Sequence, residues 1–165
     1  MKIFIISQGL PSTSAPLNGI FAWDQAIALQ KLGHEVSVMA LDFRRVLDRR
    51  IGKCYYKRDG INVFQYSLPT GIYRRFLPIL GRICANVYKD MVNEQGEPDV
   101  IHSHFYFMGA ILASMPFKPN VPIVITEHNF NAEYVVVTST KDGADFITDL
   151  NTDAKWSHNG DVHTA

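Results

Sequence analysis

Short apolar runs that alternate with helical segments constrain this chain more than any other feature. Ile3–Ile6 is an unbroken run of β-favouring residues, and Val36–Leu41 and Ile61–Tyr66 are two further β-rich runs. Runs without polar alternation are typical of strands buried on both faces of a parallel sheet. Apolar spacings of three, four and seven predict an amphipathic helix that starts at Ile20 and is capped by Gly33. Its predicted buried face comprises Ile20, Phe21, Trp23, Ile27, Ala28 and Leu32.

The same order of strands and helices continues along the chain. Strands are predicted at Asp99–Ser103 and Ile123–Thr126, and helices at Tyr73–Met91 and Phe107–Met115. The basic segment Asp42–Asp59 is predicted to be a solvated connector. Alternating strands and helices build right-handed units on a parallel sheet. We therefore expect an α/β, Rossmann-like three-layer domain with a mostly parallel sheet.

The length of 165 residues fits one compact domain. The hydrophobic share of 47% and the charged share of 19% are those of an ordinary globular protein. We place the domain at residues 1–140 and interpret residues 141–165 as a polar tail whose pattern fits no single element. Tyr134–Thr138 is a further candidate strand.

Composition also narrows the classes of function. A net charge of +0 disfavours nucleic acid as a partner. Two cysteines, Cys54 and Cys84, indicate neither a disulfide scaffold nor a zinc site and fit a reducing cytoplasm. No secretion signal is readable, and the apolar stretch Phe105–Ala113 is far below the roughly 20 residues that cross a bilayer. We expect a cytoplasmic protein, with peripheral contact at the inner membrane face left open through the arginines and aromatics of Tyr73–Arg82.

Ligands of open parallel sheets bind at the carboxyl ends of the strands, so the residues after each strand are the candidates. After the first strand, Asn18 and Gly19 lead into a helix whose free N–H groups and dipole can hold an anionic group. The alternative is that Gly19 only serves the turn. The first loop lacks the G-x-G-x-x-G fingerprint, which disfavours a dinucleotide-binding domain.

Two further polar groups follow the later strands. His102 and His104 are two residues apart and share one side if the strand persists. An imidazole there can bind a sugar hydroxyl or act near neutral pH, and the alternative is that both are structural. Glu127, His128 and Asn129 follow the next strand, where a carboxylate can fix a tautomer, bind hydroxyls or only cap the strand end.

Other kinds of site are disfavoured. Ligands on two separate strand ends do not establish the convergent geometry of a metal site, so no metal is predicted. Neither a G-x-S-x-G elbow nor a Walker-type phosphate loop is present, which disfavours hydrolases and nucleoside triphosphatases.

Four stretches together resemble the amino-terminal, acceptor-side domain of the GT-B glycosyltransferases of family four. They are Met1–Ser7, Asn18–Leu41, Pro98–Gly109 (PDVIHSHFYFMG) and Val121–Asn129 (VPIVITEHN). The pairing of PDVIHSH with VITEHN carries most of the specificity, and the resemblance extends as far as Asn129.

The resemblance implies retaining transfer of a sugar from a nucleoside diphosphate sugar to an acceptor hydroxyl, in polysaccharide or glycolipid synthesis. It implies no cofactor besides this co-substrate. By the same resemblance His104 lines the reaction centre, and Gly19 with Asn18 contacts the donor diphosphate. The residues expected to border the acceptor are His102, Glu127, His128 and Asn129.

One departure from the family limits this expectation. The second Rossmann-like domain, with its basic donor-binding residues and E-x7-E element, has no counterpart before Ala165. Half a cleft cannot orient two substrates, so we expect this fragment alone to be inactive and to need a carboxyl-terminal domain or partner chain. The alternative is a non-catalytic, Rossmann-like module that binds a sugar or a partner.

Overall fold

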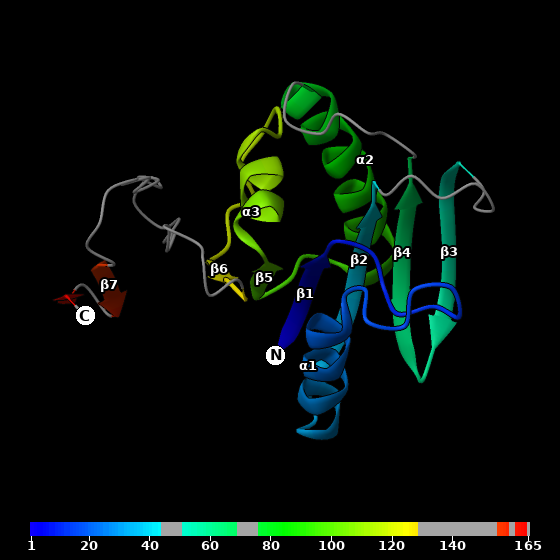
Figure 1. Ribbon diagram of the computed structural model, residues 1–165, viewed down its shortest axis with the longest axis horizontal. Coiled ribbons are helices and arrows are strands. Elements are labelled where there is room, and N and C mark those ends of the chain that lie inside the picture. Colours follow the sequence, from blue (N-terminus) through cyan, green and yellow to red (C-terminus); the bar gives the residue numbers. More distant parts are fainter. Residues whose placement is uncertain (44–50, 69–75, 129–154, 159–160, 165) are drawn as a thin grey trace.

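A six-stranded sheet in the order β3-β4-β2-β1-β5-β6 forms the centre of the molecule (Figure 1). The computed structural model describes residues 1–43, 51–68, 76–128, 155–158 and 161–164. The strands of this sheet are β1 (Lys2–Ser7), β2 (Glu35–Asp42), β3 (Gly52–Arg58), β4 (Ile61–Ser67), β5 (Val100–His104) and β6 (Ile123–Thr126). The helices are α1 (Ile20–Lys31), α2 (Leu77–Gln95) and α3 (Tyr106–Ala113).

The sheet is parallel except at one edge. β1 pairs in parallel with β2 and β5, β2 with β4, and β5 with β6, whereas β3 pairs antiparallel with β4. Each parallel neighbour requires a crossover, and α1, α2 and α3 lie within these crossovers. The prediction of an α/β, Rossmann-like three-layer domain with a mostly parallel sheet is confirmed.

β1 shows why the apolar runs become central strands. Phe4, Ile5 and Ile6 are all completely buried. Phe4 and Ile6 belong to the core cluster that packs against α2 and α3, whereas Ile5 belongs to the cluster on the α1 side. Because successive side chains of a strand point to opposite faces, only a continuous apolar run satisfies both layers.

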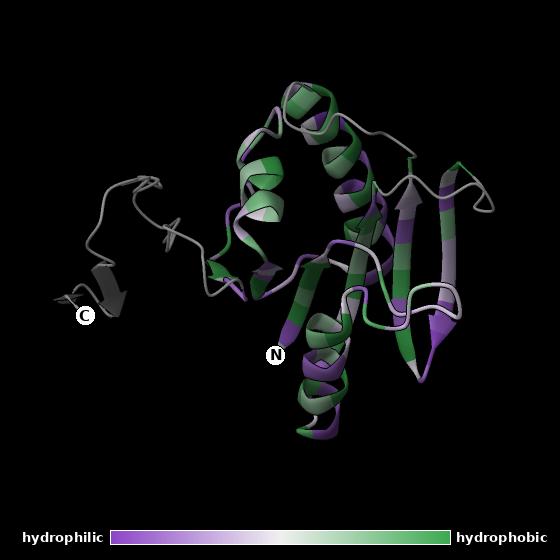
Figure 2. Ribbon diagram, viewed as in Figure 1, coloured by the Kyte–Doolittle hydropathy of each residue, from purple (hydrophilic) through white to green (hydrophobic). Residues whose placement is uncertain are grey.

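The prediction of a solvated connector at Asp42–Asp59 is wrong for its second part, where β3 lies at the edge of the sheet. Figure 2 shows that β3 is more hydrophilic than the interior strands. Lys53 and Tyr55 both donate hydrogen bonds from β3 to the carboxylate of Asp90 on α2. An edge strand with charged side chains lacks the apolar run on which the prediction relied. Residues 44–50 lie outside the described residues.

The second and third helices differ from the predicted ranges by a few residues. α2 begins at Leu77, because Pro78 suits a first turn that needs no N–H from it, and it ends at Gln95. Within α2, a Cβ on Gly81 would lie 2.3 Å from the carbonyl oxygen of Ser114, so the absence of a side chain lets the end of α3 approach closely. α3 starts at Tyr106, directly after β5, which extends to His104.

The buried face of α1 is narrower than predicted. Ala22, Trp23 and Ala26 are buried, whereas Phe21 and Leu32 are 58% and 74% exposed. Small alanines let the helix axis lie close to the sheet, and the larger residues beside them are turned outward. The predicted helix end is confirmed, since Gly33 has a φ of +84° and donates its N–H to Gln30.

The carboxyl-terminal part contains a separate element. β7 (Lys155–His158) and β8 (Asp161–Thr164) form a two-stranded antiparallel sheet within the segment interpreted as a polar tail. The candidate strand Tyr134–Thr138 and the candidate site residue Asn129 lie outside the described residues.

Among the described residues no helix has both the length and the apolar character needed to cross a bilayer.

Candidate active site

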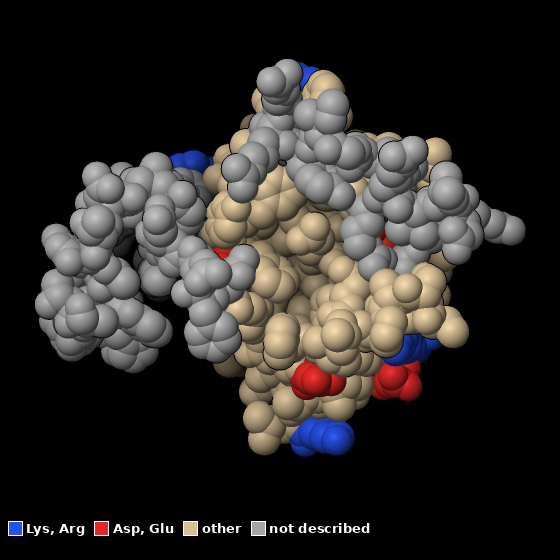
Figure 3. Space-filling view, in the orientation of Figure 1, with Lys and Arg blue, Asp and Glu red and all other residues tan. Residues whose placement is uncertain are grey.

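The candidate residues lie at the end of the sheet where the parallel strands have their carboxyl ends, which we call the carboxyl edge. β1 and β5 are neighbours with Ile6 opposite Ser103, and β5 and β6 are neighbours with His104 opposite Thr126. The chain segments that leave β1, β5 and β6 therefore start side by side. In Figure 3 a hollow opens near the centre of the view, above the carboxyl end of β1 as placed in Figure 1.

Gly19 forms a tight corner with the first loop. Its φ is +63°, and a Cβ at this position would lie 2.3 Å from the carbonyl oxygen of Gly9. The Ser7 hydroxyl donates a 2.9 Å hydrogen bond to the same oxygen, and the Asn18 amide donates to the Leu10 carbonyl at 3.5 Å. Gly19 thus lets the backbone of Gly9 approach closely, and it also serves the start of α1.

Three imidazoles form a stack at the ends of β5 and β6. His102 and His104 lie on the same side, as predicted, with ring centroids 4.6 Å apart. The Nδ1 atom of His104 lies 2.7 Å from Nε2 of His128, and these two rings are nearly parallel at 5.0 Å. His102 Nε2 lies 2.8 Å from the hydroxyl of Thr126. The two strand ends are therefore joined through side chains as well as through the sheet.

Phe21 connects this stack to the start of α1. Its ring is stacked on His128 with centroids 4.8 Å apart, and Phe105 contacts the same imidazole edge-on at 5.2 Å. Since Phe21 is two residues after Gly19, the structure brings the first loop, His104 and His128 together. Neither aromatic contact was predicted from the sequence, although Phe21 directly follows a candidate loop.

The carboxylate of Glu127 accepts hydrogen bonds from two backbone N–H groups. Its Oε2 accepts a 2.7 Å hydrogen bond from the N–H of Tyr106 at the start of α3, and its Oε1 accepts a 3.0 Å bond from the N–H of His128. Of the roles left open for Glu127, capping of backbone groups is the one that these contacts display. A carboxylate at the amino end of a helix also interacts favourably with the helix dipole.

His104 is a neutral imidazole in this site. The side chain is fully buried, and burial, followed by the nearby His102 and His128, lowers the pKa of His104 to about 3. Burial and His128 also lower the pKa of His102. Of the two uses left open for an imidazole here, a lowered pKa favours binding of a hydroxyl over a change of charge near neutral pH. Nε2 of His104 is buried and has no hydrogen-bond partner among the described residues, so its capacity to donate or accept is unused there.

The stability of the domain should fall as the pH is lowered below neutrality. The unfolded chain binds a proton at His104 near the ordinary pKa of 6.5, whereas the folded domain does so only near 3. Stability from the neutral imidazole is complete above 6.5 and is lost as the pH falls toward 3. Thermal unfolding at about pH 7.5 and about pH 5 should show a lower midpoint at the acid pH. The drop should be smaller in His104→Gln, and an equal drop would contradict the assignment.

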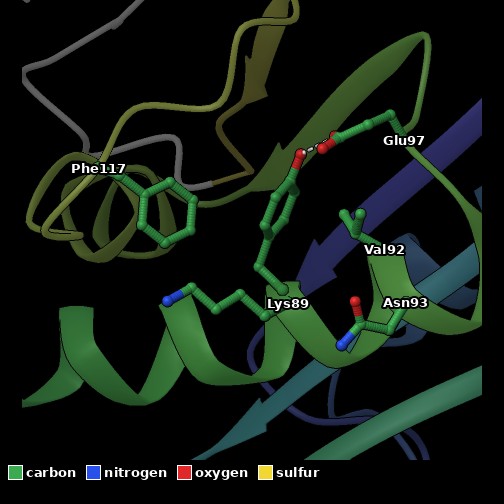
Figure 4. A pocket seen from close by; sticks show the side chains of 6 residues that line it. Lys89, Val92, Asn93, Glu97 and Phe117 are labelled. Atoms are coloured by element: carbon green, nitrogen blue, oxygen red, sulfur yellow. Dashed lines mark hydrogen bonds between the residues drawn. The ribbon is translucent and has the colours of Figure 1, made fainter.

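A second pocket, of about 170 Å³, lies at the opposite edge of the sheet. It is lined by Tyr88, Lys89, Val92, Asn93, Glu97 and Phe117. Lys89 points toward the ring of Phe117, and Glu97 lies across the pocket and accepts a hydrogen bond from Tyr88 (Figure 4). Tyr88 and Glu97 are thus paired with each other, and Lys89 lies over an aromatic ring. Among the described residues no group of three or more His, Cys, Asp or Glu is arranged to hold a metal.

A known family accounts for most of this chain. Residues 19–155 match the family model Glycosyltransferase Family 4. The chain belongs to this family. The matched segment contains Gly19, Phe21, His104 and the Glu127–His128 pair, which are the residues that converge at the carboxyl edge.

The chain is also similar to individual named proteins. TuaC of Bacillus subtilis (strain 168), named as a putative glycosyltransferase of teichuronic acid biosynthesis, is 30% identical over 140 residues, which are 78% of this chain and 36% of TuaC. Sucrose-phosphate synthase from Thermosynechococcus elongatus superposes on 78% of this chain and 33% of its own, with a TM-score of 0.50 and 16% identity. Starch synthase IV from Arabidopsis thaliana gives a TM-score of 0.49 at 14% identity over 80% of this chain and 34% of its own. The chain thus spans about a third of the length of each of these three proteins.

Proposed function

We propose that this family 4 domain is the acceptor-side half of a GT-B enzyme that transfers a sugar from a nucleoside diphosphate sugar to an acceptor hydroxyl, with retention at the anomeric carbon. We place the reaction in polysaccharide or glycolipid synthesis, in line with the biosynthetic role in the name of TuaC. The observation that carries the proposal is the buried His104, whose Nε2 is unpartnered among the described residues beside the start of α1.

A neutral His104 suits this chemistry. In the proposed reaction the sugar binds by hydrogen bonds to its hydroxyls, and the bond to the diphosphate breaks as negative charge develops on the departing phosphate. A neutral imidazole can orient a hydroxyl without adding a charge that would have to be desolvated. Its Nδ1 contact with His128 holds the ring, which leaves Nε2 for the substrate.

Donor and acceptor are assigned to different parts of the wall. We assign the donor diphosphate to the corner of Asn18 and Gly19, where the first N–H groups of α1 and its dipole favour an anion. In Figure 3 the described atoms around the hollow are mostly neither basic nor acidic. Most of the charge on a diphosphate would therefore be balanced from elsewhere. The residues assigned to the acceptor side are His102, Glu127, His128 and Asn129.

A second domain is part of the proposal. TuaC is nearly three times as long as the part of it that this chain matches. We propose that the described residues form one wall of a cleft. We propose that a further domain, in the same chain or in a partner chain, supplies the basic residues for the diphosphate. Residues 1–165 without that domain should transfer no sugar, because one wall cannot orient two substrates or exclude water.

The proposal is tested by an assay of transfer from a panel of nucleoside diphosphate sugars, with the full-length protein or with this chain plus a candidate second domain. We expect transfer from at least one donor and a product with the anomeric configuration of the donor, measured by proton NMR. Donor binding without transfer to any acceptor would favour the non-catalytic module, and a product of inverted configuration would contradict the retaining reaction.

We also propose that the start of α2 contacts an anionic membrane or a lipid-linked acceptor. Phe76 and Ile79 are 46% and 48% exposed, and Arg82 follows one turn after Ile79 on the same helix. Exposed apolar residues next to arginines are typical of interfacial contacts. Sedimentation with anionic vesicles should fall at least about threefold in Phe76→Ser with Ile79→Ser, because each exposed apolar side chain contributes to the transfer free energy. Unchanged sedimentation, with the exposed Leu17→Ser in the first loop as control, would remove this contact.

A further inference from the structure

The backbone of Phe105 is strained at the point where β5 turns into α3. Its φ is +70° and its ψ is 139°, in a region that bulky side chains rarely adopt. Phe105 directly follows His104 and directly precedes the first residue of α3. Strained residues persist where surrounding contacts determine their conformation, and they cluster at functional sites. The turn therefore requires contacts that hold it.

Hydrogen bonds from the end of β6 hold this turn. The N–H of Phe105 donates a 2.8 Å bond to the carbonyl of Thr126, and the N–H of Tyr106 donates a 2.7 Å bond to the carboxylate of Glu127. The carbonyl of Phe105 in turn accepts a 3.1 Å bond from the N–H of Met108 within α3. Two successive N–H groups at the strained turn are thus bound by two successive residues of β6 and its extension.

The other oxygen of Glu127 binds the backbone N–H of His128, a residue of the histidine stack. It accepts the N–H of His128, whose imidazole contacts Nδ1 of His104 at 2.7 Å. One carboxylate therefore connects the turn after His104 with the residue that holds the His104 ring. Only a carboxylate offers two acceptor oxygens here, since a glutamine would place an NH₂ group against one of the two N–H donors.

We propose that Glu127 is the positioning residue of the site, which fixes the orientation and the tautomer of His104 from a distance. It acts through the backbone of Tyr106 and His128. This inference rests on the proposed function only in giving His104 a substrate-binding role. The positions of the bonds themselves are independent of that role.

The tautomer is tested directly by NMR of the imidazole nitrogens in Glu127→Gln. In the parent protein His104 should stay neutral and in a single tautomer between about pH 5 and about pH 8, because its pKa lies well below this range. In Glu127→Gln we expect averaging of the two tautomers and loss of the hydrogen-bonded imidazole proton. Glu97→Gln is the matched control, because Glu97 also accepts a hydrogen bond but at the opposite edge of the sheet. Unchanged tautomers in Glu127→Gln, with folding retained, would overturn the inference.

The kinetic consequence separates this inference from the proposed function. In the transfer assay Glu127→Gln should lower kcat by about 10- to 100-fold with KM for the donor within about twofold, as expected for a misplaced group rather than a lost binding contact. Equal kcat values in Glu127→Gln and Glu97→Gln would overturn the positioning role. If the parent transfers no sugar, the proposed function fails, whereas the NMR test of Glu127 still stands.

The strain is tested by two substitutions that remove the same ring. Phe105→Gly and Phe105→Ala both lose the contact with His128, but only glycine accepts the positive φ without strain. The melting temperature of Phe105→Gly should exceed that of Phe105→Ala by roughly 2–6 °C. A higher melting temperature for Phe105→Ala would show that the turn is not strained. The turn would then not need the hydrogen bonds of Glu127 to hold it.

Discussion

Replacement of His104 by alanine is expected to lower kcat for sugar transfer by about 10²- to 10³-fold, the usual cost of losing one preorganised hydrogen-bonding group in an active site. His104 is fully buried, and its Nε2 has no partner among the described residues, so no neighbouring group replaces the lost contact. The imidazole stack also loses its central ring, since His104 stacks on both His102 and His128. Steady-state kinetics with the active donor measure the effect.

His34→Ala is the matched control for this experiment. His34 lies between the end of α1 and β2, at the opposite edge of the sheet. The His34→Ala substitution should leave kcat within about twofold of the parent value, as expected for a substitution far from the reacting groups. Full turnover in His104→Ala, with His34→Ala also active, would contradict the catalytic assignment. An equal loss in both variants would point to a general loss of folded protein, which thermal unfolding would reveal.

Substitution of Gly19 by alanine should destabilise the domain by about 2–4 kcal/mol and raise KM for the donor. Two costs add at this position. The positive φ disfavours any Cβ, and the Cβ would lie 2.3 Å from the backbone oxygen of Gly9 and 2.9 Å from the Ser7 hydroxyl oxygen. Because Gly9 is backbone, it cannot move aside as a flexible side chain would. The start of α1 would therefore be displaced, and with it the proposed diphosphate site.

Gly33→Ala separates these two costs. Gly33 has a φ of +84°, but a Cβ at this position would meet no heavy atom within 4 Å among the described residues. Alanine there should therefore cost only about 1–2 kcal/mol from the backbone conformation. Chemical denaturation of both variants gives the difference. A Gly19→Ala variant no less stable than Gly33→Ala would show that the corner between the first loop and α1 is not packed as described.

The central strands could be predicted from the sequence because burial on two faces leaves a continuous apolar run. Ile3–Ile6 and Ile123–Thr126 lie within or coincide with observed strands for this reason. β3 was missed because an edge strand is selected for charge and needs no such run. Phe21 was assigned to the helix core because apolar spacing cannot distinguish a side chain that faces the sheet from one that faces a neighbouring imidazole.

The gathering of the candidate residues could also be predicted, since polar residues that follow parallel strands must meet at one edge. The state of His104 could not, because its pKa depends on burial among His102 and His128 rather than on its neighbours in the chain. The two backbone bonds of Glu127 and the positive φ of Phe105 depend on how β6 is placed against α3. The spacing of residues along the sequence does not show how β6 and α3 are placed relative to each other.

The most direct test of the central claim, that Gly19, His104 and His128 form one wall of a single substrate pocket, is a crystal structure of the active assembly with a bound nucleoside diphosphate sugar. The sugar should lie within hydrogen-bond distance of His104, with the diphosphate at the start of α1 beside Gly19. A donor bound instead in the pocket between Tyr88 and Phe117, at the opposite edge of the sheet, would contradict the claim.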